Sequence, residues 1–181
     1  MVTVEDYLSD KKVEMSAPDA LALVTFLTDN GVLTHVDGGW GVDALLGRQT
    51  RAHEDLDIAV SHDDVPKLRR LFSARGYEEI LRDDTWACNF VLADAFGHMV
   101  DVHSYLFDAD GKHIYGCPYP LESLTGVGTI AGEEVCCISP EWTLKFHTGY
   151  EPDGNDYRDV AALCARFGLE LPTEYDRFRE R

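Results

Sequence analysis

Two aspartates with one residue between them, Asp55 and Asp57, open an apolar stretch with the length of a β-strand. Side chains at i and i+2 of a strand leave the same face, so both carboxylates would project to one side of a sheet. Carboxylate oxygens grouped in this way are ligands for hard divalent cations such as Mg²⁺. The spacing therefore predicts a metal site, although Asp-x-Asp at the start of a strand is also common in solvent-exposed turns.

A glycine pair, Gly38 and Gly39, ends a short apolar run and precedes a predicted helix. Glycines let backbone amides approach an anion closely, and a helix N-terminus adds a favourable dipole. The pair thus predicts a cradle for the β- and γ-phosphates of a nucleoside triphosphate. The alternative is a plain strand-to-helix turn.

A third acid, Asp101, interrupts an otherwise apolar stretch that can pair beside Asp55 and Asp57. Burying an unpaired acid is costly, so we expect a counter-charge, which a metal ion shared by the three aspartates would supply. If Asp101 instead points to solvent from an edge strand, no such ion is needed. His103 is two residues further along and shares its face, which makes it a candidate partner of Asp101.

Three more side chains are candidates for nucleotide binding. Arg51, just upstream of the acid pair, either binds phosphate oxygens or pairs with Glu54 or Asp55. His53 either contacts the nucleotide or organises its own loop by hydrogen bonding. Lys145, on a predicted helix, is a candidate cation for the triphosphate.

Charge limits the classes of partner. The 181 residues include 16 Lys and Arg against 33 Asp and Glu, a formal net charge of −17. DNA, RNA and anionic membranes each need a basic footprint, so we expect no nucleic-acid and no membrane partner. An acidic surface attracts a cationic small molecule, or it serves solubility alone.

The N-terminal sequence, the lengths of the apolar runs and the cysteine spacing indicate the compartment of the protein and the redox state of its thiols. No basic leader with an apolar core opens the sequence, and no apolar run approaches the length of a membrane span, so we expect a cytoplasmic protein. The five cysteines contain no Cys-x-x-Cys pair, which disfavours a zinc site. Reduced thiols are expected in that compartment.

Hydrophobic periodicity and turn signals predict an α+β chain. We expect helices over 17–29, 40–46, 63–75, 140–148 and 156–167, a last helix from 172, strands over 32–37, 55–60 and 77–81, hairpins over 86–105 and 126–138, an irregular connection over 106–125, and a short helix or loose arm over 1–15. The simplest organisation is one domain over residues 1–181. Its core would span about 17–138, with a helical C-terminal part over about 139–181.

Several blocks together resemble one enzyme superfamily. They are Asp37-Gly38-Gly39-Trp40-Gly41-Val42-Asp43, Arg51-x-His53-x-Asp55-x-Asp57, Val100-Asp101-Val102-His103, Cys137-Ile138-Ser139 and Phe146-His147-Thr148-Gly149-Tyr150-Glu151, with Asp156 and Asp159 beyond them. The pattern resembles the nucleotidyltransferase superfamily that includes polymerase beta. Within it, residues 20–165 look like the small lincosamide nucleotidyltransferases. The aminoglycoside 2″-adenylyltransferases share the first block and the carboxylates.

The resemblance implies a nucleotidyltransferase fold, a small mixed β-sheet flanked by helices with a helical C-terminal part. It implies attack of a drug hydroxyl on the α-phosphorus of ATP or another nucleoside triphosphate, with two Mg²⁺ ions. In that case Asp55, Asp57 and Asp101 would be metal ligands, and Asp101 would also act as general base. His147 and Tyr150 would line the acceptor or nucleotide pocket.

The acceptor is the least determined part of this expectation. A lincosamide ranks before an aminoglycoside, and a protein, a tRNA or a metabolite acceptor is an alternative within the same chemistry. A non-catalytic nucleotide-binding or antitoxin-like module is a further alternative, which the intact acids and glycines disfavour. In the lincosamide enzymes the position of Lys145 tends to be apolar, so this residue departs from the pattern. A homodimer is plausible for the family.

Overall fold

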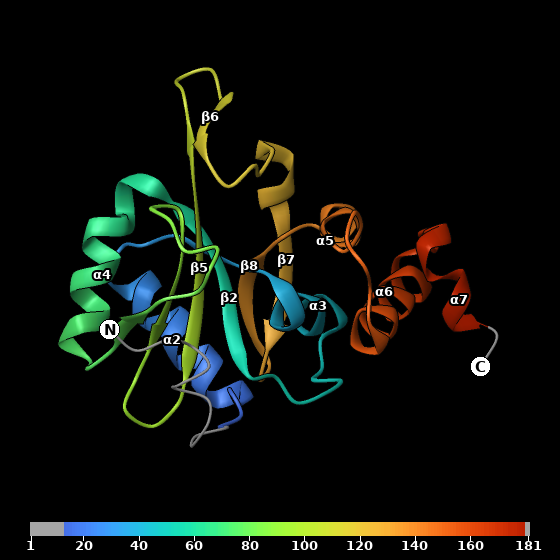
Figure 1. The fold of residues 1–181 in the computed structure, drawn as a ribbon, viewed down its shortest axis with the longest axis horizontal. Helices are drawn as coiled ribbons and strands as arrows, with labels where there is room; N and C mark the ends of the chain where they lie inside the picture. The colour runs from blue at the N-terminus through green and yellow to red at the C-terminus, as the bar shows by residue number, and fades with distance from the viewer. Residues whose placement is uncertain (1–12, 180–181) are drawn as a thin grey trace.

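The computed structural model describes residues 13–179 and contains one mixed sheet (Figure 1). Its strands are β1 (Thr34–Val36), β2 (Asp55–Ser61), β3 (Glu78–Ile80), β4 (Asn89–Ala93), β5 (Met99–Phe107), β6 (His113–Gly116), β7 (Gly126–Ile130) and β8 (Glu133–Cys137). The strand order is β3-β4-β5-β2-β1-β8-β7 in an eight-stranded sheet, with β6 paired to β5. The expected α+β class with a mixed sheet is confirmed.

The helices begin and end within two residues of the expected positions, except the last one, which begins four residues later. They are α2 (Ala17–Asp29), α3 (Gly38–Leu46), α4 (Val65–Ala74), α5 (Pro140–Phe146), α6 (Gly154–Phe167) and α7 (Asp176–Arg179), with 3₁₀ turns at His62–Asp64, Leu121–Thr125 and Thr173–Tyr175. The Ser16 side chain caps α2, and Asp153 and Asp156 form a capping box at the start of α6. Gly168, in the left-handed conformation, ends α6.

Three expectations about the elements were wrong. The segment 106–125 is not wholly irregular, because it contains β6 and a 3₁₀ turn. The helix expected from residue 63 begins with a 3₁₀ turn and becomes α-helical only at Val65. The last helix is likewise preceded by a 3₁₀ turn over Thr173–Tyr175. β6 is four residues long and pairs antiparallel with the preceding strand β5, but the glycines and prolines in and around it indicated an irregular connection. The expectation for residues 1–12 lies outside the described residues.

Strand register determines which side chains meet. β2 runs antiparallel to β1 and parallel to β5, so it lies inside the sheet, where its apolar residues are buried. In this register Asp57 is paired with Asp101, and Asp55 is paired with Met99. Both aspartates of β2 therefore leave the same face as Asp101.

The opposite face of β2 forms the main hydrophobic core. Leu56, Ile58 and Val60 are buried there in one cluster with Leu27 of α2 and Leu68 of α4. Burial of these apolar side chains away from water stabilises the layer. Because side chains alternate between the two faces of β2, the aspartates lie on the other face. The α2/α4 layer is thus the support, and the remaining face is available for a site.

The C-terminal helices flank the open face. α5 and α6 contact each other and both contact α3, and Figure 1 shows α6 and α7 at the far side of α3 from α4. A second apolar cluster lies beneath α5 and joins Ala59 of β2 to Tyr119 and Ile138. Among residues 13–179 no helix has the length and apolar character needed to cross a membrane.

Candidate active site

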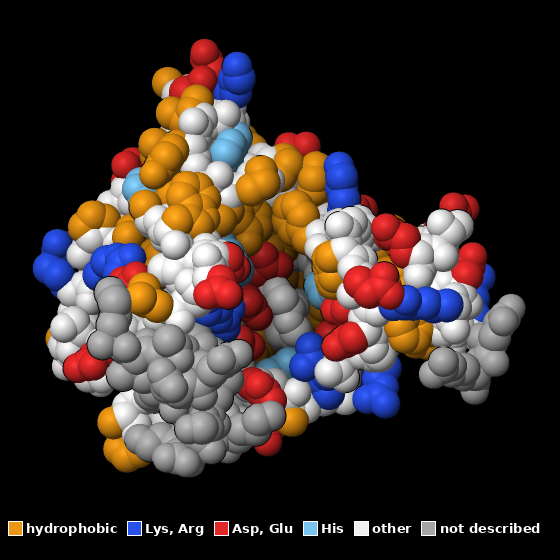
Figure 2. All heavy atoms as spheres, in the orientation of Figure 1, with side chains coloured by type: hydrophobic (Ala, Val, Ile, Leu, Met, Phe, Trp, Pro, Cys, Tyr) orange, Lys and Arg blue, Asp and Glu red, His pale blue; other side chains and the backbone are white. Residues whose placement is uncertain are grey.

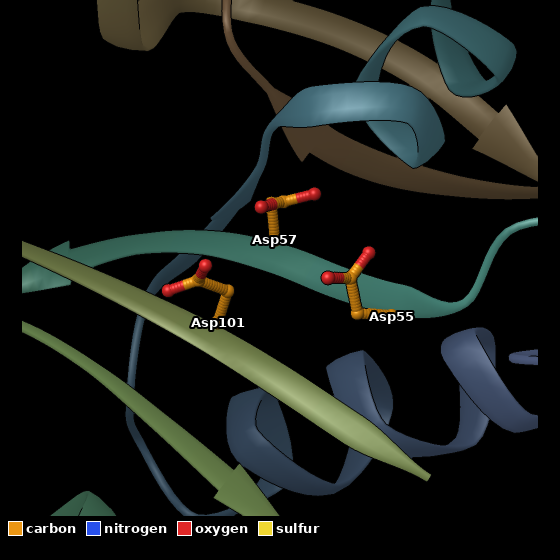
Figure 3. A group of neighbouring side chains, drawn as sticks. All are labelled: Asp55, Asp57 and Asp101. Atoms are coloured by element: carbon orange, nitrogen blue, oxygen red, sulfur yellow. The ribbon is translucent and has the colours of Figure 1, made fainter. Parts of the chain in front are cut away.

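Three aspartates converge on the open face of the sheet. Asp55 and Asp57 come from β2 and Asp101 from β5, and a ligand atom of each lies within 4.8 Å of those of the others. Figure 3 shows the carboxylates turned toward one another. β5 lies between β4 and β2, and Asp101 is 5% exposed, so the edge-strand alternative for this residue is wrong.

The cluster is electrostatically unfavourable when all members are ionised. Burial raises the pKa of Asp57 well above its usual value, and the charges of Asp55 and Asp101 raise it further. Burial, followed by the charge of Asp101, also raises the pKa of Asp55. Grouped carboxylates of this kind need a proton or a cation between them.

The donor set fits a hard divalent cation. All the converging ligand atoms are carboxylate oxygens, which Mg²⁺ prefers. One of them, the buried Oδ1 of Asp101, has no hydrogen-bond partner among the described residues. An orphaned acceptor inside an acidic cluster is the feature that a bound metal ion would satisfy.

A cation of the protein already contacts the cluster. Nη1 of Arg82 forms an ion pair with Oδ2 of Asp101, and Nη2 of Arg82 lies 3.6 Å from Oδ2 of Asp55. An arginine therefore supplies a counter-charge for Asp101. A metal ion shared by the three aspartates stays a prediction. Arg82 also lowers the pKa of Asp55 and of Asp57, against the larger effect of burial.

The glycine turn touches the acids directly. Asp37 is the N-cap of α3, and its Oδ1 accepts the Gly38 amide at 2.8 Å. Gly38 has a φ of +54°, and a Cβ at this position would lie 2.1 Å from Oδ2 of Asp57. The position thus requires glycine for its conformation and for space. The Gly38 amide is bonded to the capping carboxylate, and its contact with a phosphate stays a prediction.

Gly39 is packed against the loop that precedes β2. A Cβ on Gly39 would lie 2.5 Å from Nδ1 of His53 and 2.6 Å from Nη2 of Arg51. Nε2 of His53 is 2.6 Å from Oδ2 of the buried Asp43 of α3, so this histidine organises the loop by hydrogen bonding. A nucleotide contact of His53 stays a prediction.

Arg51 joins the same loop to α6. Its Nη2 lies 2.9 Å from Oδ2 of Asp159, and its Nε bonds the same carboxylate at 3.2 Å. This forked pair is a geometry that arginine and carboxylate favour. Asp159 was not among the partners expected for Arg51, because the two residues are distant in sequence. Phosphate binding by Arg51 stays a prediction.

A cavity of about 280 Å³ opens beside the aspartates. Its lining comprises Asp37, His103, Cys117, Pro118, Tyr119 and Phe146. Nε2 of His103 lies 3.7 Å from Oδ1 of Asp101, in agreement with the expected neighbourhood of these residues. Figure 2 shows a hollow between the sheet and the C-terminal helices, with acidic side chains on its floor. An acceptor in this cavity would lie next to Asp101.

The remaining candidates lie apart from this cavity. Lys145 is exposed, and its Nζ lies 4.1 Å from the centre of the Trp142 ring. Nδ1 of His147 bonds the Thr143 carbonyl at 2.8 Å at the end of α5. Tyr150 is 47% exposed and donates its hydroxyl proton to Asp156 at 3.0 Å. None of these three residues lines the cavity, and their roles in binding stay predictions.

Sequence reasoning missed two residues of the site. Arg82 is the single Lys or Arg between positions 76 and 111, and the expected counter-charge of Asp101 was a signal that could have singled it out. Tyr119 donates a hydrogen bond of 2.6 Å from its hydroxyl to Oδ2 of Asp37. It comes from a Pro-rich stretch without periodicity, and no local pattern marks it.

Known proteins resemble this chain over most of its length. A model of the family described as aminoglycoside-2''-adenylyltransferase matches residues 19–163. A lincosamide resistance protein of Staphylococcus haemolyticus is 29% identical over 135 residues, which are 71% of this chain and 81% of that protein.

Two solved structures share the fold. The lincomycin-bound lincosamide antibiotic adenylyltransferase LnuA has a TM-score of 0.71 at 23% identity, covering 83% of this chain and 98% of that one. ANT(2")-Ia in complex with adenylyl-2"-tobramycin has a TM-score of 0.69 at 20% identity, covering 91% and 98%. The expected nucleotidyltransferase fold is confirmed. With its family match spanning residues 19–163, the chain belongs to the aminoglycoside-2''-adenylyltransferase family of antibiotic nucleotidyltransferases.

Proposed function

We propose that this protein transfers a nucleoside monophosphate, AMP from ATP, to a hydroxyl group of a small antibiotic, a lincosamide in preference to an aminoglycoside. The observation that carries the proposal is the convergence of Asp55, Asp57 and Asp101 beside a cavity and a glycine turn. Membership in a family of antibiotic nucleotidyltransferases supports the same chemistry.

Asp55, Asp57 and Asp101 would hold Mg²⁺. When bound, Mg²⁺ ions neutralise charge on the triphosphate and orient the attacking and leaving oxygens. Asp101 is the one of the three nearest the cavity residue His103, so it is the group placed to accept the proton of an acceptor hydroxyl. Asp37 and Tyr119 hold the start of α3 against Asp57 and so orient the site.

The first turn of α3 supports binding of the donor. Helix geometry leaves the first amides of a helix without partners inside it, and they favour an anion. The Gly38 amide donates its hydrogen bond to Asp37. We therefore propose that the Gly39 amide is the one of the pair that donates a hydrogen bond to a phosphate. Arg51 is next to Gly39 and adds a positive charge on that side.

The character of the cavity favours a lincosamide as acceptor. Four of its lining residues, Cys117, Pro118, Tyr119 and Phe146, present mostly apolar surface. An acceptor with an apolar part buries that part there, whereas a polycationic aminoglycoside needs several facing carboxylates. The similarity to the lincosamide resistance protein agrees with this order.

An aminoglycoside is the second candidate because of charge. The net charge of −17 attracts a polycation, and the family model that matches is the aminoglycoside one. The net charge raises the encounter rate of any cationic drug, but it does not determine which hydroxyl group reacts.

Mass spectrometry of a drug panel tests the proposal. Lincosamides and aminoglycosides are incubated with the protein, Mg²⁺ and each common nucleoside triphosphate in turn. We expect one lincosamide to gain the mass of one AMP with release of pyrophosphate, and EDTA to prevent it. Gain of mass by aminoglycosides only would reverse the order of acceptors.

Two variants show whether the aspartates perform the reaction. Asp57→Asn keeps the shape of the side chain and removes a proposed metal ligand, so we expect product to fall below detection while the melting curve stays cooperative. Asp110→Asn makes the same chemical change in an exposed turn and should leave the rate unchanged. Normal turnover by Asp57→Asn would contradict the assignment of the site.

A further inference from the structure

Arg82 contacts two of the three carboxylates that we propose as metal ligands. Its guanidinium contacts Oδ2 of Asp101 through Nη1 and approaches Oδ2 of Asp55 through Nη2 at 3.6 Å. These carboxylates belong to the group whose ligand atoms lie within 4.8 Å of one another. One side chain of the protein thus bridges two of the three residues assigned to metal binding.

The position of Arg82 is built into the fold. The residue follows β3, and a turn fixes its backbone, because its amide bonds Oγ1 of Thr85 at 2.8 Å and its carbonyl accepts the Thr85 amide at 3.1 Å. β4 separates β3 from β5 in the sheet. A side chain starting beyond β3 must therefore extend across β4 to reach Asp101, and arginine has the length to do so.

Electrostatic repulsion among the aspartates explains why Arg82 lies against Asp101. Asp101 has a side chain that is 7% exposed, and Arg82 is 30% exposed, so the guanidinium partly covers the acid from solvent. Without a cation the buried carboxylates repel each other and lose hydration. With Arg82 in place the cluster is compensated before any metal ion arrives.

We propose that Arg82 is a resident counter-cation of the acidic cluster, which a divalent metal ion must displace when it binds. The inference rests on the proposed function, because it takes the aspartates to be the metal site. A guanidinium fork and a metal ion compete for the same carboxylate oxygens, and each disfavours the other through like charge. Arg82 therefore keeps the metal-free protein folded and weakens metal binding in the absence of nucleotide.

Displacement also gives Arg82 a place in the loaded site. The side chain is flexible and partly exposed, so once released it remains within reach of the carboxylate face. A nucleoside triphosphate brings phosphate oxygens to that face, and a guanidinium binds these in a forked geometry. Nucleotide thus offers Arg82 new partners in exchange for Asp101, and nucleotide and metal binding support each other.

The test measures Mn²⁺ binding to the full-length, nucleotide-free protein by electron paramagnetic resonance. It compares wild type, Arg82→Gln and Arg69→Gln. If Arg82 occupies the site about nine-tenths of the time, its removal tightens the apparent dissociation constant for Mn²⁺ about tenfold. We also expect Arg82→Gln to lower the melting temperature in EDTA and saturating Mn²⁺ to restore much of that loss.

Arg69→Gln is the matched control. Arg69 lies on α4, where it pairs with Glu79 and lies 3.8 Å from the centre of the Phe90 ring. Its side chain is 35% exposed, against 30% for Arg82, and its loss changes the net charge by the same amount. General attraction of cations by the acidic surface therefore changes equally in both variants, and only the local effect differs.

The outcomes separate this inference from the proposed function. Equal or weaker Mn²⁺ binding by Arg82→Gln than by Arg69→Gln would overturn the role of Arg82 and leave the metal site intact. Absence of Mn²⁺ binding in all three proteins would overturn the metal assignment and this inference with it. If Arg82→Gln does not fold even with Mn²⁺, Arg82→Lys replaces it in the test. Lysine cannot form the guanidinium fork with Asp101, so we expect Arg82→Lys to bind Mn²⁺ more tightly than wild type. Unchanged Mn²⁺ binding by Arg82→Lys would contradict the role of Arg82.

Discussion

Asp57 is the residue at which the electrostatic cost of this site is concentrated. It lies between Gly38 on one side and the carboxylates of Asp55 and Asp101 on the other. Burial and those two charges raise its pKa well above the ordinary value. At a pH between the ordinary pKa and the raised one, the folded protein binds a proton at Asp57 that the unfolded chain releases.

This shift predicts how stability depends on pH without metal. A folded state that binds more protons than the unfolded state loses stability as pH rises. We expect the melting temperature in EDTA to fall from about pH 4 upward, through the raised pKa of Asp57. Asp57→Asn should flatten that fall, with each kcal/mol recovered worth about 2–4 °C. An equal slope for Asp57→Asn and for the control Asp110→Asn would contradict the assignment.

Gly38 predicts a loss of both stability and activity when a methyl group is added. A residue with a side chain is strained at the φ of +54° found here. The new Cβ would also lie only 2.1 Å from Oδ2 of Asp57, so the Asp57 carboxylate would have to move. We expect Gly38→Ala to destabilise the fold by about 1–2 kcal/mol and to slow turnover about 100-fold. Denaturant melts and initial rates measure these effects.

Gly154→Ala is the control for that substitution. Gly154 opens α6, and a Cβ there meets no atom within 4 Å. Its replacement should leave the rate unchanged and alter stability by less than about 1 kcal/mol. A similar loss of rate in both variants would show that Gly38 has no special contact with Asp57.

At the scale of elements, the loop over residues 47–54 connects the glycine turn to the C-terminal helices. His53 bonds Asp43 of α3, and Arg51 pairs with Asp159 of α6. Asp43 also accepts hydrogen bonds from the amide and hydroxyl of Thr50, at 3.0 and 2.6 Å. One loop is therefore held by two helices, α3 and α6.

Removal of the α6 contact predicts a looser loop. Asp159 is 3% exposed and Arg51 26% exposed, so solvent screens this pair only in part. We expect Asp159→Ala to cost about 1–3 kcal/mol and to raise the KM for nucleotide more than the KM for acceptor. Asp176→Ala, which breaks an exposed ion pair with Arg179, should change neither value. Equal increases in both KM values for Asp159→Ala would place the effect outside the loop.

At the scale of the whole molecule, the net charge of −17 favours encounter with a cationic acceptor. Summed acidic charge attracts a cation over distances limited by the Debye length, about 8–10 Å at physiological salt. The same field repels a nucleoside triphosphate that is not neutralised. Acceptor and donor therefore respond to salt in opposite directions.

This opposition is measurable by steady-state kinetics in rising NaCl. We expect kcat/KM for a cationic acceptor to fall as salt increases, while the KM for the nucleotide stays constant or decreases. An uncharged derivative of the same acceptor serves as the control and should show no fall. A fall of equal size for the charged and uncharged acceptors would exclude steering by the protein charge.

Local sequence patterns were enough to predict the acids, the glycines and most of the helices and strands. Asp55 and Asp57 are two positions apart on one strand, so strand geometry alone places them on one face. Capping residues and glycines marked α2, α3 and the end of α6, because those signals act within a few residues. The position of Asp101 beside them followed from the apolar character of its strand.

The partners of these residues, in contrast, depend on how the chain folds in three dimensions. Arg82 reaches Asp101 across β4, Arg51 reaches Asp159 on α6, and Tyr119 reaches Asp37 from the segment before β7. Each pair joins side chains that are 19 to 108 positions apart in the chain. Local sequence patterns report local backbone geometry, whereas charge pairing and cavity lining depend on strand order and helix packing, which bring distant segments together.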